Sequence, residues 1–260
     1  MSSAVVSGWQ ELPAADGLRL RCWWARPAGE PPRAAVLVLP EVFGLNAWVR
    51  GVAERLAAEG YGALAMPIFA RSAPDLDVGY DEAGLAAGRE HRDLVSAEAF
   101  LADARAALAW LQAQPGLNKP VGCVGFCFGG HLAMLAATLQ QVAATCDAYG
   151  ARVSSFRPGG GEPTLAVVPE IPGHLLCLAG DRDPLMPAEE LEAIAAALAA
   201  DAARRPQLER RLVVAPGAGH GFFCDARADY HPHAATLGWQ EMLDLFDRRL
   251  GLTEALSPGR

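Results

Sequence analysis

The sequence lacks the features that mark several large classes of protein. No apolar run reaches the ~18 residues that a membrane-spanning helix needs. Residues 1–4 show no basic region followed by an apolar one, so we expect no secretory signal. Internal repeats and low-complexity segments are also missing. The net charge of -8 and the pI near 5.3 disfavour nucleic acid and anionic membranes as partners.

The cysteines are too scattered to suggest a disulfide framework. Most of them lie inside apolar, strand-like runs, as buried thiols do. We therefore expect reduced cysteines and a cytoplasmic location. The six positions are Cys22, Cys123, Cys127, Cys146, Cys177 and Cys224.

The chain is long enough for one α/β domain covering residues 1–260, and 52% of it is hydrophobic. Apolar strand-like runs alternate with amphipathic helical patterns, which predicts a mostly parallel central sheet with helices on both faces. The expected strands are 18–25, 34–39, 61–66, 121–124, 143–149, 174–179 and 208–215. The expected helices are 47–59 after the Asn46 cap, 93–112, 131–139, 187–204 and 234–250.

Three segments of the chain have a distinctive pattern or composition. Residues 18–25 alternate apolar and polar side chains, which predicts a half-buried strand at an edge of the sheet. Residues 151–173 are rich in Gly and Pro, and we interpret them as a long excursion or lid rather than a domain linker. The tail after Gly251 is expected to be loose.

The segment Gly125-Phe-Cys-Phe-Gly-Gly130 carries the strongest functional signal. It follows an apolar strand and precedes an apolar helical pattern, which is the context of a nucleophile elbow. The turn is so tight that a side chain two residues before or after the nucleophile would clash, and Gly125 and Gly129 occupy those places. Cys127 then takes the nucleophile position, and because only a thiolate attacks, a base must control its proton.

Chemistry-bearing residues follow three other strand ends, and open parallel sheets place their sites at that edge. Glu41 comes before the nucleophile, an acid after it, and His220 last. Nucleophile, acid, histidine is the chain order of an α/β-hydrolase triad, with the histidine as base. The backbone N–H groups of Phe128 and Val42 would form the oxyanion hole.

Each element alone also has a simpler interpretation. A glycine-rich turn suits any tight strand-to-helix crossing, and an acid at a strand end often only caps a helix. Asp181 and Asp183 both fit the acid position. Glu41 taken alone is typical of a solvated loop acid.

The chain resembles the dienelactone hydrolase (carboxymethylenebutenolidase) family from about Ala34 to Leu250. Five segments carry the resemblance: the glutamate segment 41–46, the arginine segment 69–74, the cysteine elbow 125–130, the acid segment 183–187 and the histidine turn 219–222. In the family a proline follows the acid by four residues. Pro187 stands four after Asp183, so the resemblance favours Asp183 over Asp181.

The resemblance implies an α/β-hydrolase fold and hydrolysis of a lactone or ester through a cysteine acyl-enzyme. It implies that the residue matching Glu41 accepts the thiol proton when an anionic substrate binds. It further implies that arginines hold the substrate carboxylate, and Arg71 matches one of them. Phe43 in the glutamate segment and Tyr149 are further expected substrate contacts.

Two departures separate this chain from the family pattern. Cys224 stands where the family has its second arginine, and Arg227, three residues further on, is the candidate replacement. Ala148 replaces the first residue of a tyrosine pair. The fold and the triad therefore transfer more securely than the substrate.

The two charges near the thiol have opposite effects. An adjacent imidazolium favours the thiolate, whereas a carboxylate such as Glu41 disfavours it. We expect Glu41 and Cys127 at the same rim of the sheet, and hence a resting thiol that is mostly neutral.

No metal or organic cofactor is expected. His231 and His233 are separated by Pro232 and lack a third ligand at suitable spacing. The expected partner is a small-molecule lactone or ester that bears a carboxylate, bound by a monomer or small homo-oligomer. The alternatives are a carboxylesterase of small neutral esters, a thiol redox protein pairing Cys127 with Cys123 or Cys224, and a non-catalytic ligand-binding relative.

Overall fold

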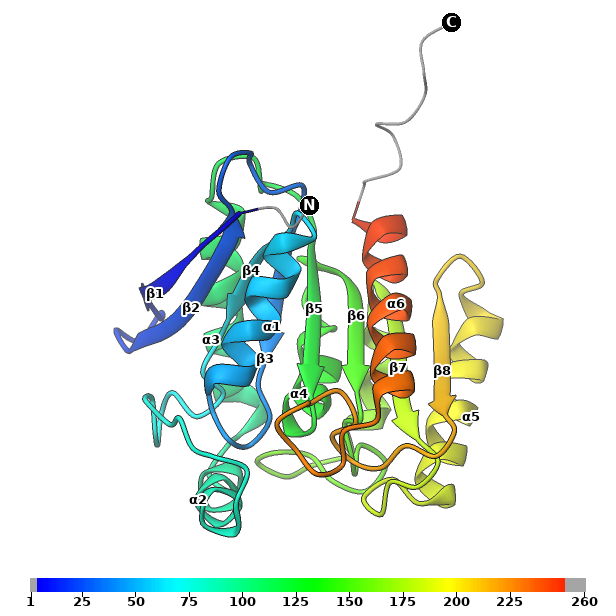
Figure 1. Ribbon diagram of the computed structural model, residues 1–260. Helices are drawn as coiled ribbons and strands as arrows, with labels where there is room; N and C mark the ends of the chain where they lie inside the picture. Colours follow the sequence, from blue (N-terminus) through cyan, green and yellow to red (C-terminus); the bar gives the residue numbers. More distant parts are fainter. Residues whose placement is uncertain (1–3, 251–260) are drawn as a thin grey trace, which may run out of the picture.

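The computed structural model describes residues 4–250, and within them one eight-stranded sheet runs through the molecule (Figure 1). The strand order is β1-β2-β4-β3-β5-β6-β7-β8. The tail after Gly251 lies outside the described residues. The strands are β1 Val5–Pro13, β2 Arg19–Pro27, β3 Ala35–Leu39, β4 Gly62–Ala65, β5 Val121–Phe126, β6 Val142–Ala148, β7 His174–Gly180 and β8 Arg210–Ala215.

Helices cover both faces of the sheet. In Figure 1, α1 and α6 lie in front of the strands, and α3, α4 and α5 lie behind them. Both faces of the central strands are therefore covered, and every residue of β3 and β5 is buried. The helices are α1 Ala47–Ala58, α2 Glu82–Arg92, α3 Ala97–Gln112, α4 Phe128–Ala136, α5 Ala188–Arg204 and α6 Pro232–Arg249.

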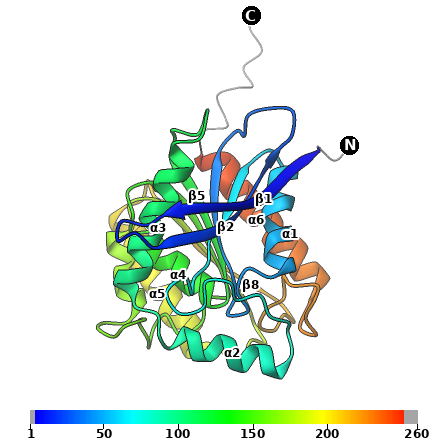
Figure 2. The same cartoon turned by 90° about the vertical axis from the view of Figure 1, so that its left-hand side faces the viewer.

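The prediction of a mostly parallel, doubly covered α/β sheet is confirmed. The strands from β4 through β3 and β5 to β8 pair in parallel. Only β1 and β2 are antiparallel to their neighbours. Figure 2 shows this pair running across the side of the molecule, at a large angle to the other strands, as the twist of a sheet requires.

Two predictions about single elements are wrong. The strand at 18–25 is not the edge, because β1 pairs with β2 along its whole length and forms the edge itself. The helix expected at 93–112 starts at Ala97, where the Ser96 side chain accepts a hydrogen bond from Ala99 N. A separate helix, α2, precedes it, and Leu94 between them is 67% exposed instead of lining the core.

The excursion between β6 and β7 is anchored to the body of the protein. Both ring nitrogens of buried His131, on α4, form hydrogen bonds with it: Nδ1 lies 2.9 Å from Ala151 O and Nε2 2.7 Å from Thr164 Oγ1. Glu190 on α5 accepts a hydrogen bond from Ser154 N. Residues 164–170 form a short 3-10 helix. The segment is thus packed against α4 and α5.

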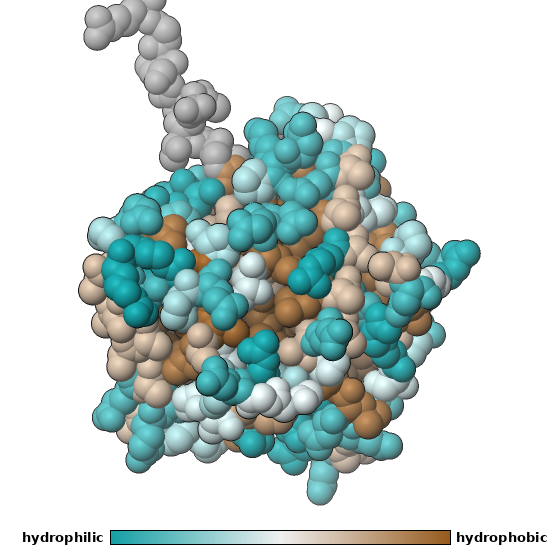
Figure 3. All heavy atoms as spheres, turned by 180° about the vertical axis from the view of Figure 1, so that it is seen from behind, coloured by the Kyte–Doolittle hydropathy of each residue, from teal (hydrophilic) through white to brown (hydrophobic). Residues whose placement is uncertain are grey.

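The outer surface behind the sheet is mixed in character. Seen from behind, polar residues cover most of the periphery, and apolar residues show in the middle of the face (Figure 3). The parallel strands all end at the lower edge in Figure 1, and the loops that follow β3, β5, β7 and β8 gather there. No described helix is long and apolar enough to cross a membrane.

Helix α2 reaches this edge through a close backbone contact that can be tested. A Cβ added at Gly88 would lie 2.2 Å from Val42 O, so Gly88→Ala must push α2 away from the loop after β3. We expect it to lower the free energy of unfolding by about 1–3 kcal/mol. In α1, a Cβ at Gly51 meets nothing within 4 Å, so Gly51→Ala should raise stability by about 0.5–1 kcal/mol. Thermal unfolding of both variants checks this, and equal shifts would contradict the packing of α2 on Val42.

Candidate active site

The elbow between β5 and α4 holds Cys127 in a strained backbone conformation, with φ 55° and ψ -121°. A Cβ at Gly125 would lie 1.9 Å from Gly129 O, and one at Gly129 would lie 2.4 Å from Leu39 O. The structure thus gives the steric reason for the two flanking glycines. Residues other than glycine rarely adopt positive φ, and such strain is often found at functional sites.

Three side chains from different strand ends form one chain of hydrogen bonds at the elbow. The Nε2 atom of His220 lies 3.0 Å from Cys127 Sγ, and its Nδ1 lies 2.8 Å from Asp183 Oδ2. Both His220 and Asp183 are buried, and Cys127 is partly exposed. The structure therefore brings together the thiol, the histidine and one of the two candidate acids.

The two aspartates after β7 are clearly distinguished. Asp183 contacts His220 with one oxygen and accepts a hydrogen bond from Leu185 N at 2.8 Å with the other. Asp181 is exposed and accepts a hydrogen bond from Gly217 N at 2.6 Å. Asp181 thus stabilises the turn after β8, and only Asp183 can orient the imidazole.

The surroundings of His220 favour its charged form. Burial disfavours the imidazolium, but a charged Cys127 and the hydrogen bond to Asp183 outweigh that effect and raise the pKa of His220 to about 10. The proton shared by the thiol and the imidazole belongs to the coupled pair. An imidazolium beside Sγ stabilises a thiolate and so favours a reactive nucleophile.

Glu41 lies at the same rim, where its partner is Arg227. Arg227 Nη1 donates to Glu41 Oε1 at 2.8 Å, and the other carboxylate oxygen of Glu41 is buried without a partner in the described chain. Burial raises the pKa of Glu41, and the positive charges of Arg227 and His220 oppose that shift. The guanidinium packs so closely on Gly221 that a Cβ there would lie 2.6 Å from Arg227 Cζ.

This ion pair changes the expected influence of Glu41 on the thiol. The expectation of a neutral resting thiol relied on an unbalanced carboxylate beside Cys127. Arg227 offsets that negative charge, and the raised pKa of His220 favours the imidazolium. The carboxylate expected beside Cys127 is therefore balanced by a cation, and the neutral resting thiol stays a prediction.

Arg71 is engaged by two carboxylates. Its guanidinium donates two hydrogen bonds to Asp103, at 2.7 and 3.1 Å, and a third to Asp16 at 2.7 Å. These contacts connect the loop after β4 with α3 and with the β1–β2 turn. Arg71, which matches a substrate-binding arginine of the family, thus already has two carboxylate partners, and its contact with substrate stays a prediction.

The remaining expected residues lie at the elbow or contact His220 and Arg227. Phe128 begins α4, so its N–H belongs to the first turn, where no intrahelical acceptor exists. Val42 follows β3 beside the elbow. The Tyr149 ring lies 5.2 Å from the His220 ring, measured between centroids, and Arg227 lies 5.7 Å from the centre of the Phe43 ring.

Tyr80 was not among the residues expected at the site. Its ring packs edge-on against Phe43 with centroids 4.5 Å apart, and its hydroxyl contributes to lowering the pKa of Glu41. It lies in the irregular segment before α2, which has no periodicity to indicate burial. Only the folded arrangement places this side chain at the rim.

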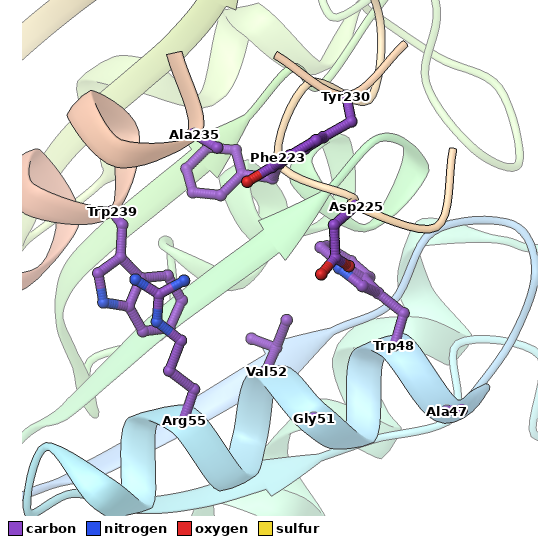
Figure 4. A pocket seen from close by; sticks show the side chains of 10 residues that line it. All are labelled: Ala47, Trp48, Gly51, Val52, Arg55, Phe223, Asp225, Tyr230, Ala235 and Trp239. Carbon is purple, nitrogen blue, oxygen red and sulfur yellow. The ribbon is translucent and has the colours of Figure 1, made fainter. Parts of the chain in front are cut away.

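The loop that carries His220 has a second side, which faces a cleft of about 350 Å³ between α1 and α6 (Figure 4). On one wall the Arg55 guanidinium stacks on the Trp239 ring at 3.8 Å. Phe223 on this loop also packs against Phe126, just before the elbow, with centroids 5.5 Å apart. Further lining residues are Trp48, Val52, Asp225 and Tyr230.

The arrangement suits acyl transfer. A thiol contacts a base, the base is oriented by a buried carboxylate, and helix N–H donors lie beside the thiol, as the chemistry requires. Within residues 4–250, no group of three or more His, Cys, Asp and Glu side chains is placed to hold a metal ion. The sheet order and the elbow define an α/β-hydrolase.

Comparisons with known proteins give the family. Residues 20–250 match the profile of the Dienelactone hydrolase family. A relative from Synechocystis sp., with the provisional name carboxymethylenebutenolidase, is 38% identical over 90% of this chain and 94% of its own. The carboxymethylenebutenolidase of Pseudomonas putida is 30% identical, covering 82% of this chain and 85% of its own. The chain belongs to the dienelactone hydrolase family and is a hydrolase of a lactone or ester.

A solved structure agrees with this assignment. The Klebsiella pneumoniae subsp. pneumoniae protein, provisionally named a dienelactone hydrolase, superposes with a TM-score of 0.81 at 28% identity. The match covers 94% of this chain and 99% of that one. The predicted α/β-hydrolase fold is confirmed.

The two aspartates provide a matched test of the site. Asp183→Asn removes the charge that holds the imidazole, so kcat on an ester such as p-nitrophenyl acetate should fall about a thousandfold or more. Asp181→Asn is the control, and its kcat should stay within about twofold of wild type, because that carboxylate only supports a surface turn. A larger loss for Asp181→Asn than for Asp183→Asn would reverse the assignment.

Proposed function

We propose that Cys127 is the covalent nucleophile and that hydrolysis passes through a thioester acyl-enzyme. The single observation that carries this proposal is the 3.0 Å contact between Cys127 Sγ and an imidazole whose other nitrogen lies 2.8 Å from buried Asp183. Such a contact lets His220 take the thiol proton, and Asp183 fixes the tautomer and stabilises the imidazolium.

The first half of the reaction forms the acyl-enzyme. The Cys127 thiolate bonds to the substrate carbonyl carbon, and the carbonyl oxygen becomes an oxyanion next to the N–H groups of Phe128 and Val42. The carbonyl then re-forms and the ester C–O bond breaks. The leaving oxygen carries the electron pair of that bond, and His220 can supply its proton.

The second half regenerates the thiol. A water molecule loses a proton to a base and attacks the thioester carbonyl. Neutral His220 or, for a lactone of the family type, the expelled enolate supplies that base. The C–S bond breaks, the sulfur leaves as thiolate, and a carboxylic acid is released. Lactone opening and ester cleavage differ only in whether the leaving oxygen stays attached to the acyl group.

We also propose that the substrate bears a carboxylate and that Arg227 recognises it. Arg227 donates to Glu41, and although burial disfavours the charged guanidinium, the negative charges of Glu41 and Cys127 raise the pKa of Arg227. A guanidinium binds a carboxylate through parallel hydrogen bonds. A substrate carboxylate can replace Glu41 on Arg227, and the released Glu41 can then act together with His220 on the single thiol proton.

The redox alternative fits the structure less well. All six cysteines are free. Burial raises the pKa of Cys123, and burial raises the pKa of Cys224 to about 12. A resolving thiol needs thiolate character, and neither candidate partner of Cys127 has it. Reduced, buried thiols also support the proposal of a cytoplasmic location.

The arginine proposal leads to a comparison of two variants. Arg227→Gln should raise KM about 10–100-fold for a lactone that bears a carboxylate, because a charge-assisted hydrogen bond is lost. A neutral ester should change far less. Arg71→Gln is the control, since Arg71 is held by Asp103 and Asp16, and both substrates should respond alike. A selective effect on the anionic lactone in Arg71→Gln, with none in Arg227→Gln, would exchange the two roles.

The nucleophile itself can be tested by trapping. Mass spectrometry after rapid mixing with a lactone should find the acyl group on the peptide that contains Cys127, and Cys127→Ala should lose about 10⁴-fold or more in kcat. Cys22→Ala, in the buried part of β2, is the control and should retain the acyl adduct. An active Cys127→Ala variant on every ester would refute the proposal.

A further inference from the structure

A buried carboxyl group lies beneath the elbow without a cation. Asp147 on β6 is 1% exposed. Its Oδ1 accepts a hydrogen bond from Gly150 N at 2.8 Å, and its Oδ2 has no hydrogen-bond partner in the part of the chain that the structure describes. No salt bridge of Asp147 is found among residues 4–250. A buried acid of this kind needs an explanation, because isolated charges are costly to bury.

Two glycines make room for this carboxyl. A Cβ at Gly130, in the first turn of α4, would lie 2.5 Å from Asp147 Oδ1, and one at Gly150 would lie 2.2 Å from the same atom. The carboxyl thus fills the space between the start of α4 and the turn that follows β6. Both segments touch groups that the proposed mechanism uses.

The turn after β6 connects Asp147 with the thiol and the imidazole. Ala148 O accepts a hydrogen bond from Cys127 N at 3.0 Å. Tyr149 has a positive φ of 44°, and its ring lies 5.2 Å from the His220 ring. A change at residues 148–150 therefore reaches both members of the reacting pair.

No neighbour supplies a positive charge. Glu190 on α5 adds a negative one, and the His131 ring on α4 is neutral at neutral pH because burial lowers its pKa to about 4. Burial raises the pKa of Asp147 to about 7, and Glu190 adds to this rise while the Gly150 N–H opposes it. The other titratable groups around it are the thiols of Cys123 on β5, Cys146 on β6 and Cys177 on β7, whose pKa values burial raises.

We propose that Asp147 is a positioning residue for the Cys127–His220 pair, and that it acts in its neutral form. The neutral carboxyl keeps the turn at 148–150 closed against α4. Its ionised form places a charge in an apolar interior with a single N–H donor. The turn then opens toward water, because hydration lowers the free-energy cost of burying that charge. This inference rests on the proposed function of Cys127, since the pair is positioned for that chemistry.

The expected pH dependence follows from the raised pKa. In the unfolded chain an aspartate titrates near pH ~4. The folded state therefore holds the proton more tightly, and the contribution of Asp147 to stability is complete below about pH 4 and is lost as pH rises through about 7. An asparagine keeps the Oδ1 acceptor for Gly150 and never ionises, so it should lack this loss.

The test compares Asp147→Asn with wild type from pH 5.5 to 8.5, on p-nitrophenyl acetate. The ratio of the two kcat/KM values cancels the titration of Cys127 and His220. We expect a ratio near one at the acid end, rising in favour of the variant by about tenfold at the alkaline end. The thermal midpoint of the variant should rise relative to wild type over the same range. Glu190→Gln is the control and should keep the wild-type profile to within about twofold.

Two outcomes would overturn the role of Asp147: a ratio that does not change with pH, or a rise that appears in Glu190→Gln instead. If Asp147→Asn does not fold, infrared spectra that detect protonated carboxyl groups provide a second test of the proposal. In the Glu41→Gln background, the band of a protonated buried carboxyl should disappear between about pH 6 and 8. A band that is absent at pH 6 would overturn the proposal. Activity that survives in Cys127→Ala would instead refute the proposed function.

Discussion

The contact between the backbones of β5, α4 and β3 is the constraint on which the site depends. At Gly125 and Gly129 the chain approaches itself so closely that no Cβ fits. These contacts allow the sharp turn that holds Cys127 at positive φ and starts α4 directly after it. The thiol is therefore placed by two neighbouring strands and one helix start, and it does not depend on the conformation of a flexible loop.

The charges at the rim are arranged in separate pairs. Asp183 is matched to His220, and Glu41 to Arg227. Arg71 belongs to a third group with Asp103 and Asp16. The two pairs still interact, because charges in a region of low dielectric influence one another strongly. The charge of His220 opposes the rise in the pKa of Glu41, and that of Cys127 raises the pKa of Arg227.

Local patterns made much of the fold and the triad readable from the sequence. The elbow combines an apolar strand, glycines at fixed spacing and an apolar helix, all within about twenty residues. His220 and the two aspartates follow strands directly, so their edge of the sheet could be predicted. Asp181 and Asp183 follow the same strand, so the choice of Asp183 needed the family resemblance. In the structure only Asp183 reaches the imidazole, whereas Asp181 accepts a hydrogen bond from Gly217 N.

The features that were missed depend on contacts between distant segments. The edge strand β1 alternates only weakly in burial, and α2 is short and mostly exposed, so neither shows a clear apolar pattern. Leu94 fits the helical period of α3 in sequence but lies before its Ser96 cap. The only local sign of Asp147 was an acid inside an apolar strand, which is unusual because buried acids are rare.

If Arg227 has the role proposed for it, a binding cation has changed its position in the sequence while keeping its chemistry. An alignment column compares residues that hold the same rank in the sequence, and by that measure Cys224 records the loss of an arginine. A long side chain on an irregular loop can supply a cation from a neighbouring position in the sequence, and the Arg227 guanidinium has room to do so beside Gly221. Relatives of this protein that lack an arginine in the expected column should be compared by where their guanidinium groups lie in space before a change of substrate is inferred.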